Sequence, residues 1–532
     1  MNGARKLALR THVVRLLVLL SLAPRGAAAV DLRLPGEGRT VRLQLTETLL
    51  TEYHADSDVL DGNPGERYVD FKNRTDIVLM HGSTTLNVRF DFNLYANTEE
   101  SSVHQSHLSL EKISLSTIQR VFDATAGDFH ARIGRGLALD LTRVTEMFRD
   151  TTLRGAELRV RTRYVSGQAF GGWVNPLDVD DFTELEQRVP SDVIGGARLE
   201  VRPRESLQLG LHYVGGGMQP QTGTSRNATH TLGASVELPN LARRMTLYGE
   251  FDYMSRAAAL EVIHGYGTYL SGTGNFGPLA ALLELKFYSH LRFYNDFGSE
   301  IDTYVYNRPP TLTRSKAEVL NNHDVIGPRL KLDLRIGPRG TVVFANYGFF
   351  FYSDARPGED FFTNGSSSHD AFGGIQQPLP GGALDISGGY RLDSRDQGGE
   401  KVTEYTCGFA EAELSFAVYR GHTLEVEAQY RNIIKGANTF WDVYVGVGYR
   451  PNKWVSGGFS YEYSTEFKDP DLTDDIGVRN HYGGVRATVN FTPTTYARIF
   501  GGTTRGGVRC IDGFCREFPP FVGFRAEVVA QF

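Results

Sequence analysis

The nearest approach to a catalytic triad in this sequence is the run Ser366-Ser367-Ser368-His369-Asp370. In a serine hydrolase, a histidine removes the proton of the serine hydroxyl and an aspartate orients that histidine. Neighbouring residues on an extended chain point in opposite directions, so contiguous residues of these types do not form a triad. The run Asn321-Asn322-His323-Asp324 fails for the same reason. We predict polar loops at both places and no catalytic residue, and a membrane-embedded hydrolase stays an alternative without an assigned site.

Four carboxylates lie close together in the run Asp469-Pro470-Asp471-Leu472-Thr473-Asp474-Asp475. Such clusters can bind calcium. This run lacks the glycine and the distal glutamate of an EF-hand loop, which favours a solvated acidic loop. We therefore predict no bound metal and no cofactor.

Two of the three cysteines lie five residues apart, Cys510 and Cys515 in Cys-Ile-Asp-Gly-Phe-Cys, and the third is Cys407. The pair can close a small disulfide-bonded loop in an oxidising compartment. A metal site is the less favoured interpretation, because no histidine or further cysteine lies nearby to complete it.

Arginines recur at alternate positions as Arg159, Arg161 and Arg163, and Arg132 lies close by in sequence. Arginines that line a pore favour anionic solutes. Unpaired charges on a crowded wall are costly, however. The favoured interpretation is that these arginines pair with carboxylates, either Glu157 on the same segment or Glu425 and Glu427 across the lumen.

The segments that position these side chains alternate between apolar and polar residues. From Thr85 to Tyr95, the residues Leu86, Val88, Phe90, Phe92 and Leu94 share one parity. Successive side chains of an extended strand point to opposite faces, so this segment has one apolar and one polar face. The same pattern recurs in Ala156–Tyr164, Leu207–Tyr213, Leu330–Ile336, Leu424–Tyr430 and Trp441–Tyr449. Repetition along the whole chain predicts an all-β protein.

Short and long connections alternate between these segments. The short ones are rich in Pro, Gly and Asn: Arg202–Glu205, Gly337–Gly340, Pro378–Gly382, Arg450–Lys453 and Thr492–Thr494. The long ones are polar: Gly298–Asn322, Ser353–Ser368, Leu392–Lys401, Ser464–Asn480 and Thr503–Pro520. Short turns at one rim and long loops at the other are typical of bacterial outer-membrane barrels. We predict one large antiparallel transmembrane β-barrel with short periplasmic turns and long extracellular loops.

Both ends of the chain agree with export to the outer membrane. Residues 1–29 show the basic, apolar and small-residue order of a cleaved signal peptide, with cleavage expected after Ala29. The barrel is expected over residues 30–532. Its last segment alternates and ends on a terminal phenylalanine, which resembles the signal that the barrel-assembly machinery recognises. The residues that carry this assembly signal are Phe524, Val528 and Phe532.

Counting the alternating segments predicts about 22 strands, with 20 to 24 compatible with the even counts of bacterial barrels. The N-terminal third contributes Val41–Tyr53, Tyr68–Met80, Thr85–Tyr95 and His107–Ile118, with Phe129–Leu141 as a further candidate. Residues 127–152 break the rhythm. An ordinary bulged strand followed by a loop is the favoured interpretation, and insertion of the segment into the lumen is the alternative.

The irregular segment resembles one found in a group of uncharacterised outer-membrane proteins, which share the pattern Gly-Asp-Phe/Tyr-x4-Gly-Arg-Gly-Leu-x-Leu. The matching residues are Gly127, Asp128, Phe129, Gly134, Arg135, Gly136, Leu137 and Leu139. The resemblance covers some fifteen residues and implies a barrel of this group, without an established activity.

The residues expected on the inner wall are rich in charged side chains and glycine. This composition favours a channel or transporter-like barrel for small polar solutes. An assembly or surface-display barrel that is plugged by its own segments is the alternative, and the irregular segment motivates it. Expected partners are outer-membrane lipid, the barrel-assembly machinery and a small polar or anionic solute. The net charge of −6 is spread along the chain, which argues against binding of nucleic acid.

Overall fold

The computed structural model describes most of the chain. The described residues are 30–33, 40–55, 67–96, 107–144, 150–175, 192–218, 227–258, 261–295, 304–313, 322–355, 359–362, 365–397, 400–419, 421–466, 480–511, 514–518 and 521–532. The expected signal peptide and the acidic run Asp469–Asp475 lie outside these residues. Among the described residues, no helix is long and apolar enough to cross a bilayer.

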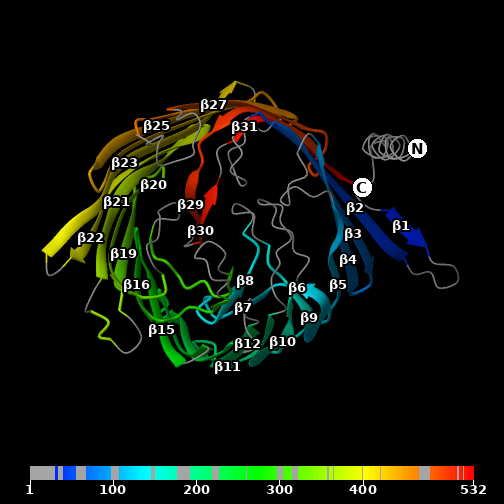
Figure 1. The fold of residues 1–532 in the computed structure, drawn as a ribbon, viewed down its shortest axis with the longest axis vertical. Helices are drawn as coiled ribbons and strands as arrows, with labels where there is room; N and C mark the ends of the chain where they lie inside the picture. Colours follow the sequence, from blue (N-terminus) through cyan, green and yellow to red (C-terminus); the bar gives the residue numbers. More distant parts are fainter. Residues whose placement is uncertain are drawn as a thin grey trace.

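One antiparallel sheet closes on itself into a ring (Figure 1). The sheet has 25 strands, and β1 pairs only with β2 and lies outside the ring, which leaves 24 strands in the wall. The wall consists of β2 (Thr40–His54), β3 (Tyr68–His81), β4 (Thr84–Ala96), β5 (His107–Ile118), β6 (Phe122–Phe129), β9 (Leu153–Arg161), β10 (Val165–Val174), β11 (Val193–Arg204), β12 (Leu207–Met218), β13 (Asn227–Leu241), β14 (Met245–Ala258), β15 (Glu261–Phe276), β16 (Leu279–Ser289), β19 (Val325–Ile336), β20 (Thr341–Ser353), β21 (Gly365–Leu379), β22 (Gly382–Gln397), β23 (Glu400–Tyr419), β24 (His422–Lys435), β25 (Asn438–Arg450), β26 (Val455–Ser464), β27 (His481–Asn490), β28 (Tyr496–Thr504) and β31 (Phe521–Gln531).

The remaining strands are short and do not belong to the wall. They are β1 (Val30–Arg33) and three hairpin pairs, β7 (Ala131–Ile133) with β8 (Leu139–Leu141), β17 (Tyr294–Asn295) with β18 (Tyr304–Val305), and β29 (Gly507–Ile511) with β30 (Phe514–Phe518).

The expected count of about 22 strands was too low. One missed strand is β6, whose central residues Ala124, Thr125, Ala126 and Gly127 are small and give no alternation of large apolar and polar side chains. The candidate strand Phe129–Leu141 is not part of the wall, because the chain leaves the wall at Phe129 and forms the β7–β8 hairpin instead.

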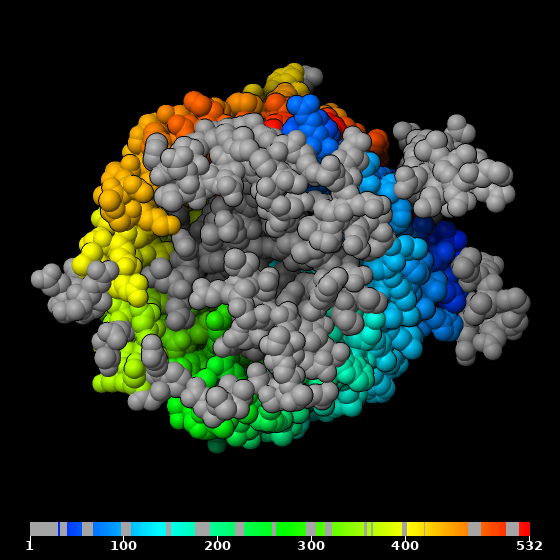
Figure 2. All heavy atoms as spheres, in the orientation of Figure 1, coloured from blue at the N-terminus to red at the C-terminus, as the bar shows by residue number. Residues whose placement is uncertain are grey.

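The first and last strands of the ring close it. Residues Thr46–His54 of β2 pair with Gly523–Gln531 of β31, and Phe532 exchanges two backbone hydrogen bonds with Leu45, of 2.8 and 3.0 Å. Figure 2 shows blue atoms, from early in the sequence, beside red atoms of its last residues in the wall near the top of the view. Phe524 is exposed on the outer surface, and Val528 and Phe532 share its parity. Their role as an assembly signal stays a prediction.

The rims differ, but less completely than expected, because only Gly436 and Ala437 connect β24 to β25 at the rim of the long loops. Short turns connect β3 to β4, β11 to β12, β19 to β20 and β27 to β28 at one rim. The predicted long loop Leu392–Lys401 is wrong in extent, because β22 continues to Gln397 and β23 begins at Glu400. These two strands extend their hairpin farther than the sequence indicated.

The outer surface of the wall is apolar and the inner surface is mostly polar. Along β12, Leu209, Leu211 and Tyr213 are exposed, whereas the alternate residues Gly210, His212 and Val214 are buried. Leu211 is 62% exposed and Val485 of β27 is 60% exposed. Large exposed apolar side chains all around a closed ring form a belt that faces lipid, because water would penalise such a surface.

The lipid belt predicts that Leu211→Arg destabilises the barrel. Leu211 lies near the middle of β12, and an arginine facing lipid at mid-depth costs about 2–4 kcal/mol. Urea unfolding in lipid vesicles would measure the loss. The control is Gln208→Arg, on the inner parity of the same strand, for which a change below about 1 kcal/mol is expected. Equal losses in the two variants would contradict the assigned faces.

Candidate functional site

Two connections between wall strands contribute residues to the interior of the ring. We call them together the inner wedge, and it comprises the described residues of 130–152, between β6 and β9, and of 290–324, between β16 and β19. Figure 1 shows β7 and β8 of the inner wedge inside the ring. The irregular segment of the sequence therefore leads into the lumen.

The inner wedge is attached to the wall through an apolar core. Ile133, Leu137 and Leu139 have no exposed surface. They belong to one buried cluster that also includes Ala131, Ala138 and Leu141 of the same segment. Its other members come from the inner face of the wall and from the second wedge segment: Phe129, Leu153, Phe170, Val174, Ile194, Val214, Met218, Tyr248, Met254, Tyr269, Tyr288, Leu291, Phe293, Tyr306, Leu312, Val325, Phe350 and Tyr352. On this side the lumen is filled by packed side chains.

The first residues of the shared motif make the exit from the wall. Gly127 has a φ of 103°, and a Cβ there would clash with the carbonyl of Ile113. The carboxylate of Asp128 accepts the backbone N–H of Ile113 at 2.7 Å and pairs with Arg154 at 3.0 Å. These contacts bind β6 to β5 and β9 at the point where the chain turns inward.

The middle of the motif docks onto β14. The backbone N–H of Arg135 donates to Glu250 at 2.8 Å, and its guanidinium stacks over Tyr248 at 4.6 Å. Gly134 lies against the Glu250 carboxylate so closely that a Cβ would clash with it. Gly136, with a φ of 92°, lies against the second wedge segment, where its carbonyl accepts the N–H of Arg308 at 2.8 Å.

The two segments of the inner wedge hold each other by further hydrogen bonds. Asn307 donates to the carbonyl of Leu137 at 2.9 Å, and the N–H of Asp140 donates to Tyr306 at 2.7 Å. The guanidinium of Arg308 pairs with the buried carboxylate of Asp140 at 3.0 Å. The segments are far apart in sequence but form one folded unit.

Asp150 fastens the far end of the first segment to β4 and β5. Its carboxylate contacts Lys112 at 2.7 Å, Arg89 at 3.3 Å and His130 at 2.7 Å. Burial alone would raise the pKa of Asp150, but the hydrogen bond from His130 and the charge of Lys112 lower it below its usual value. In the second segment, burial and the charge of Arg292 lower the pKa of His323 to about 4.

The arginines singled out by sequence are paired with nearby carboxylates. Arg159 binds Glu157 at 2.8 Å, and Arg161 binds Asp123 on β6. Arg163 lies in the turn after β9, 75% exposed, and its nearest carboxylate is Glu205 at 3.7 Å. The expected position of Arg163 on the inner wall was wrong, because β9 ends at Arg161.

Arg132 on β7 lies 3.7 Å from Asp140 and its side chain is 47% exposed. Pairing across the lumen was wrong for Glu425, which binds Arg450 on the neighbouring strand β25 at 3.4 Å. Among the described residues, no ion pair joins Glu427 to Arg159, Arg161 or Arg163. The width of the ring favours partners on adjacent strands over partners across it.

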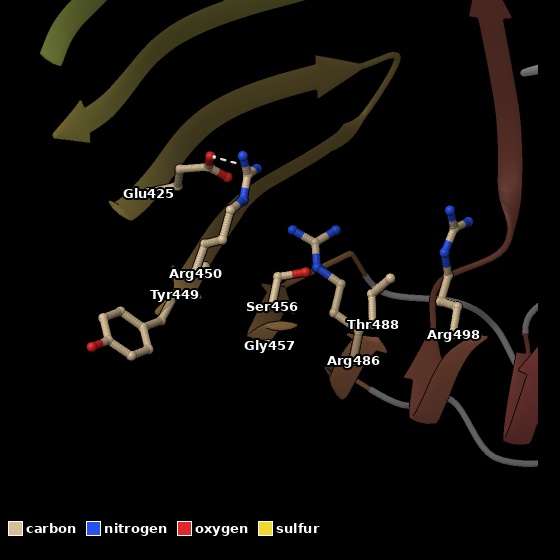
Figure 3. Close-up of a pocket in the computed structure, with 9 residues that line it drawn as sticks. Glu425, Tyr449, Arg450, Ser456, Gly457, Arg486, Thr488 and Arg498 are labelled. Atoms are coloured by element: carbon tan, nitrogen blue, oxygen red, sulfur yellow. Dashed lines mark hydrogen bonds and ion pairs between the residues drawn. The ribbon is translucent and has the colours of Figure 1, made fainter. Parts of the chain in front are cut away.

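A charged cavity of about 380 Å³ lies on the inner wall along β24–β28 (Figure 3). Its lining residues are Glu425, Gly448, Tyr449, Arg450, Ser456, Gly457, Arg486, Thr488 and Arg498. Arg450 pairs with Glu425, and Arg498 pairs with Glu527 at 3.3 Å. Within the described part of the chain, Arg486 contacts no carboxylate at ion-pair distance.

The cavity depends on strand register. Glu425 is opposite Gly448, Gly448 is opposite Gly458, and Gly458 is opposite Arg486. Two strands therefore present glycine where larger side chains would fill the space, and a Cβ at Gly458 would lie 2.9 Å from the Arg486 guanidinium. Sequence parity could have placed Arg486 on the inner face, but no sequence signal brings the three arginines together.

The Ser366–Asp370 run does not form a triad. It lies within β21, not in a loop as expected. His369 points to the outer face and is hydrogen-bonded to Tyr347 at 3.0 Å, whereas Ser368 and Asp370 are buried inside. Adjacent positions on a strand separate these groups to opposite faces of the wall.

The backbone pairs Cys510 of β29 with Cys515 of β30. Directly opposite residues of an antiparallel pair have Cα atoms about 4.5–5.5 Å apart, within the range of a disulfide. The bond between them stays a prediction. Figure 1 shows this hairpin within the outline of the ring.

No protein-family model matches the chain, and no curated protein matches its sequence. Several solved structures, however, match its fold. The E. coli P pilus tip assembly intermediate PapC-PapD-PapK-PapG aligns with a TM-score of 0.50 and 10% identity over 96% of this chain and 66% of that chain. The siderophore receptor PirA from Pseudomonas aeruginosa gives 0.47 and 9% over 92% and 80%, and the P pilus usher (PapC) translocation pore gives 0.42 and 11% over 92% and 99%. At such identities the likeness concerns the fold alone.

A closed ring with an apolar outer belt gives every wall strand a hydrogen-bonded neighbour on both sides without water, which a bilayer requires. In bacteria, rings of this kind lie in the outer membrane. This chain is an outer-membrane β-barrel. Its candidate functional site is the lumen, which the inner wedge fills on one side and the charged cavity borders on the other.

Gly136→Ala is expected to loosen the inner wedge, because Ala resists a positive φ and its Cβ would lie 2.6 Å from the carbonyl of Arg308. We expect hydrogen exchange to report an opening free energy for residues 131–141 lower by about 2–3 kcal/mol. The matched control is Gly82→Ala, at a glycine that also has a positive φ, 58°, in a turn with open space around it, and it should leave the wedge unchanged. A wedge as stable in Gly136→Ala as in the parent would contradict the docking described above.

Acidification is expected to loosen the second wedge segment. Because the pKa of folded His323 is about 4 and the ordinary value is about 6.5, the open state binds the proton first, and stability falls as pH drops from about 6.5 towards 4. Hydrogen exchange at residues 305–313, corrected for the intrinsic rate, should show a loss of about 1–2 kcal/mol between pH 7 and 5. His323→Asn should remove that part of the pH dependence, and an unchanged pH dependence in this variant would refute the assignment.

Proposed function

We propose that this barrel is a transporter-like channel of the outer membrane for small polar solutes. Its path runs between the inner wedge and the wall formed by β24–β28. The observation that carries the proposal is the asymmetry of the lumen: apolar packing closes one side, and a cavity lined by three arginines borders the other. Solutes that move along the charged wall would meet polar groups and fixed charge.

The charge of the cavity favours anions. Arg450 and Arg498 each have a carboxylate partner, whereas Arg486 carries a charge that no described carboxylate neutralises at ion-pair distance. Figure 3 shows Arg486 between the other two arginines. A cationic side chain on a pore wall attracts anions. Because its strand already positions this side chain, little further ordering is needed when an anion approaches. We therefore propose that small anions pass more readily than cations of the same size.

The inner wedge would restrict the path. Motif residues Gly127, Asp128 and Phe129 lie where the chain leaves β6, and motif residues from Gly134 to Leu139 make contacts of the wedge itself. We propose that docking of such a segment is what the motif does in the group of barrels that the chain resembles. The wedge then sets the free cross-section, and its loosening would widen the path.

A second candidate function is a plugged barrel that assembles with a protein partner. The observation in its favour is the fully buried core by which the wedge is held in the lumen. The two functions differ in conductance, because a plugged assembly barrel passes no solute while its plug is docked.

Transport is tested with purified protein in planar bilayers and in liposomes. Neutralising Arg486 with Arg486→Gln should lower the anion-to-cation permeability ratio by a factor of about 2–5, as expected for the loss of roughly 0.5–1 kcal/mol of attraction. Arg163→Gln serves as the matched control, because Arg163 is exposed in a turn away from the cavity. The ratio should not change there.

The wedge variant Gly136→Ala should increase conductance in the same assay. Absence of conductance and of solute uptake in both the parent and Gly136→Ala would refute the channel and favour the plugged barrel.

A further inference from the structure

His212, Glu250 and Asp252 form a buried cluster on the inner wall beneath the inner wedge. His212 belongs to β12, and Glu250 and Asp252 belong to β14. Register brings them together across β13, because His212 is opposite Gly233 and Gly233 is opposite Asp252. A Cβ on Gly233 would clash with both side chains, so the glycine leaves the space in which they meet.

The three side chains present a compact set of donor atoms. His212 Nε2 lies 2.5 Å from Asp252 Oδ1 and 4.0 Å from Glu250 Oε1. One nitrogen and two carboxylate oxygens lie within 4.8 Å of one another. The side chain of His212 is 1% exposed, and those of Glu250 and Asp252 are 0% exposed.

Each of the three side chains also carries a buried polar atom without a hydrogen-bond partner. These atoms are Nδ1 of His212, Oε1 of Glu250 and Oδ2 of Asp252. The other oxygen of Glu250 is used, since Oε2 accepts the Tyr248 hydroxyl at 2.5 Å and the N–H of Arg135 at 2.8 Å. Oε1 is thereby left facing His212 inside the cluster.

The charge of the cluster is not balanced by the protein. Among the described residues, His212 is the only basic side chain within ion-pair distance of Glu250 or Asp252. Two ionised carboxylates and one imidazole leave net negative charge at a site with almost no exposed surface, which is costly unless a cation compensates it. A divalent ion bound by His212 Nε2, Glu250 Oε1 and the Asp252 carboxylate would supply the missing charge and a partner for the unpaired Oε1.

We propose that His212, Glu250 and Asp252 bind one divalent transition-metal ion, with zinc the best match. Imidazole with carboxylates suits zinc and its neighbours, whereas calcium and magnesium prefer oxygen ligands throughout. Ligands bound at about 2.0–2.2 Å lie roughly 3–4 Å apart, so small side-chain movements suffice.

The bound ion clamps the inner wedge. Glu250 is at once a metal ligand and the acceptor for Arg135, and it lies against Gly134. An ion that fixes the Glu250 carboxylate therefore fixes the acceptor on which the wedge docks. Binding of the ion does not depend on the proposed transport function, so a barrel without conductance could still bind metal.

The experiment uses the folded full-length barrel, stripped of metal by a chelator. Calorimetry with Zn²⁺ and the visible absorption of Co²⁺ should both show one ion per chain. His212→Gln and Asp252→Asn should each weaken binding by at least about 10-fold. The matched control is His230→Ala on β13, whose ring bonds to Tyr213 on the exposed outer face; it should bind the ion as the parent does.

Two further measurements keep the test decisive. Heat-modifiable migration on gels verifies that each variant is folded, and Glu250→Gln replaces any variant that is not, because Gln retains an acceptor for Tyr248 and Arg135 but loses the charge. In the parent, Zn²⁺ should slow hydrogen exchange at residues 131–141, and not in Asp252→Asn. The site is overturned if the folded parent binds no stoichiometric Zn²⁺ or Co²⁺, or if the ligand variants bind as tightly as the parent. Stoichiometric binding with unchanged exchange overturns the clamp.

Discussion

The structure depends on one constraint, which is that hydrocarbon offers no partner for a backbone N–H or carbonyl. Every strand of the wall therefore has a neighbour on both sides, and the chain meets itself where β31 pairs with β2 and Phe532 bonds to Leu45. Closure also fixes which face of each strand lies outside. Once one parity faces lipid, the other must face the lumen. The side chains that can bind ions or solutes therefore lie on the inner face.

A ring of 24 strands encloses more space than its own inner side chains fill. On one side of the lumen the inner wedge fills that space, and it packs against the wall through a hydrophobic core inside the ring. The wall strands that face the wedge carry apolar residues on both faces, such as Val214 inside and Leu211 outside on β12. The wall strands β24–β28 face no described wedge segment and carry charged inner residues, so two environments coexist in one lumen.

Charge on the inner wall follows the same division. Where neighbouring strands present opposite charges, they neutralise each other, as Arg161 with Asp123 and Arg450 with Glu425. Arg486 and the cluster at Glu250 are two places among the described residues that lack that balance. Arg486 leaves positive charge beside a cavity, which suits a passing anion, and the cluster at Glu250 leaves negative charge in a closed site, which suits a resident cation. The two sites differ in their access to solvent: the cavity at Arg486 suits an anion that passes, whereas the closed cluster at Glu250 suits a cation that stays bound.

The sequence by itself determined the class of the fold, the position of most strands and the lipid-facing parity, because alternation is a local property that each strand displays alone. It also located the irregular motif, since Gly127, Gly134 and Gly136 interrupt that alternation. It did not determine the strand β6, whose small residues carry no pattern, or the pairing of Glu425. The cavity at Arg486 and the cluster of His212, Glu250 and Asp252 were decided only by tertiary structure, because both depend on the register between neighbouring strands. The register places a glycine of one strand between functional side chains of the two neighbouring strands. The sequence of a single strand does not contain that information.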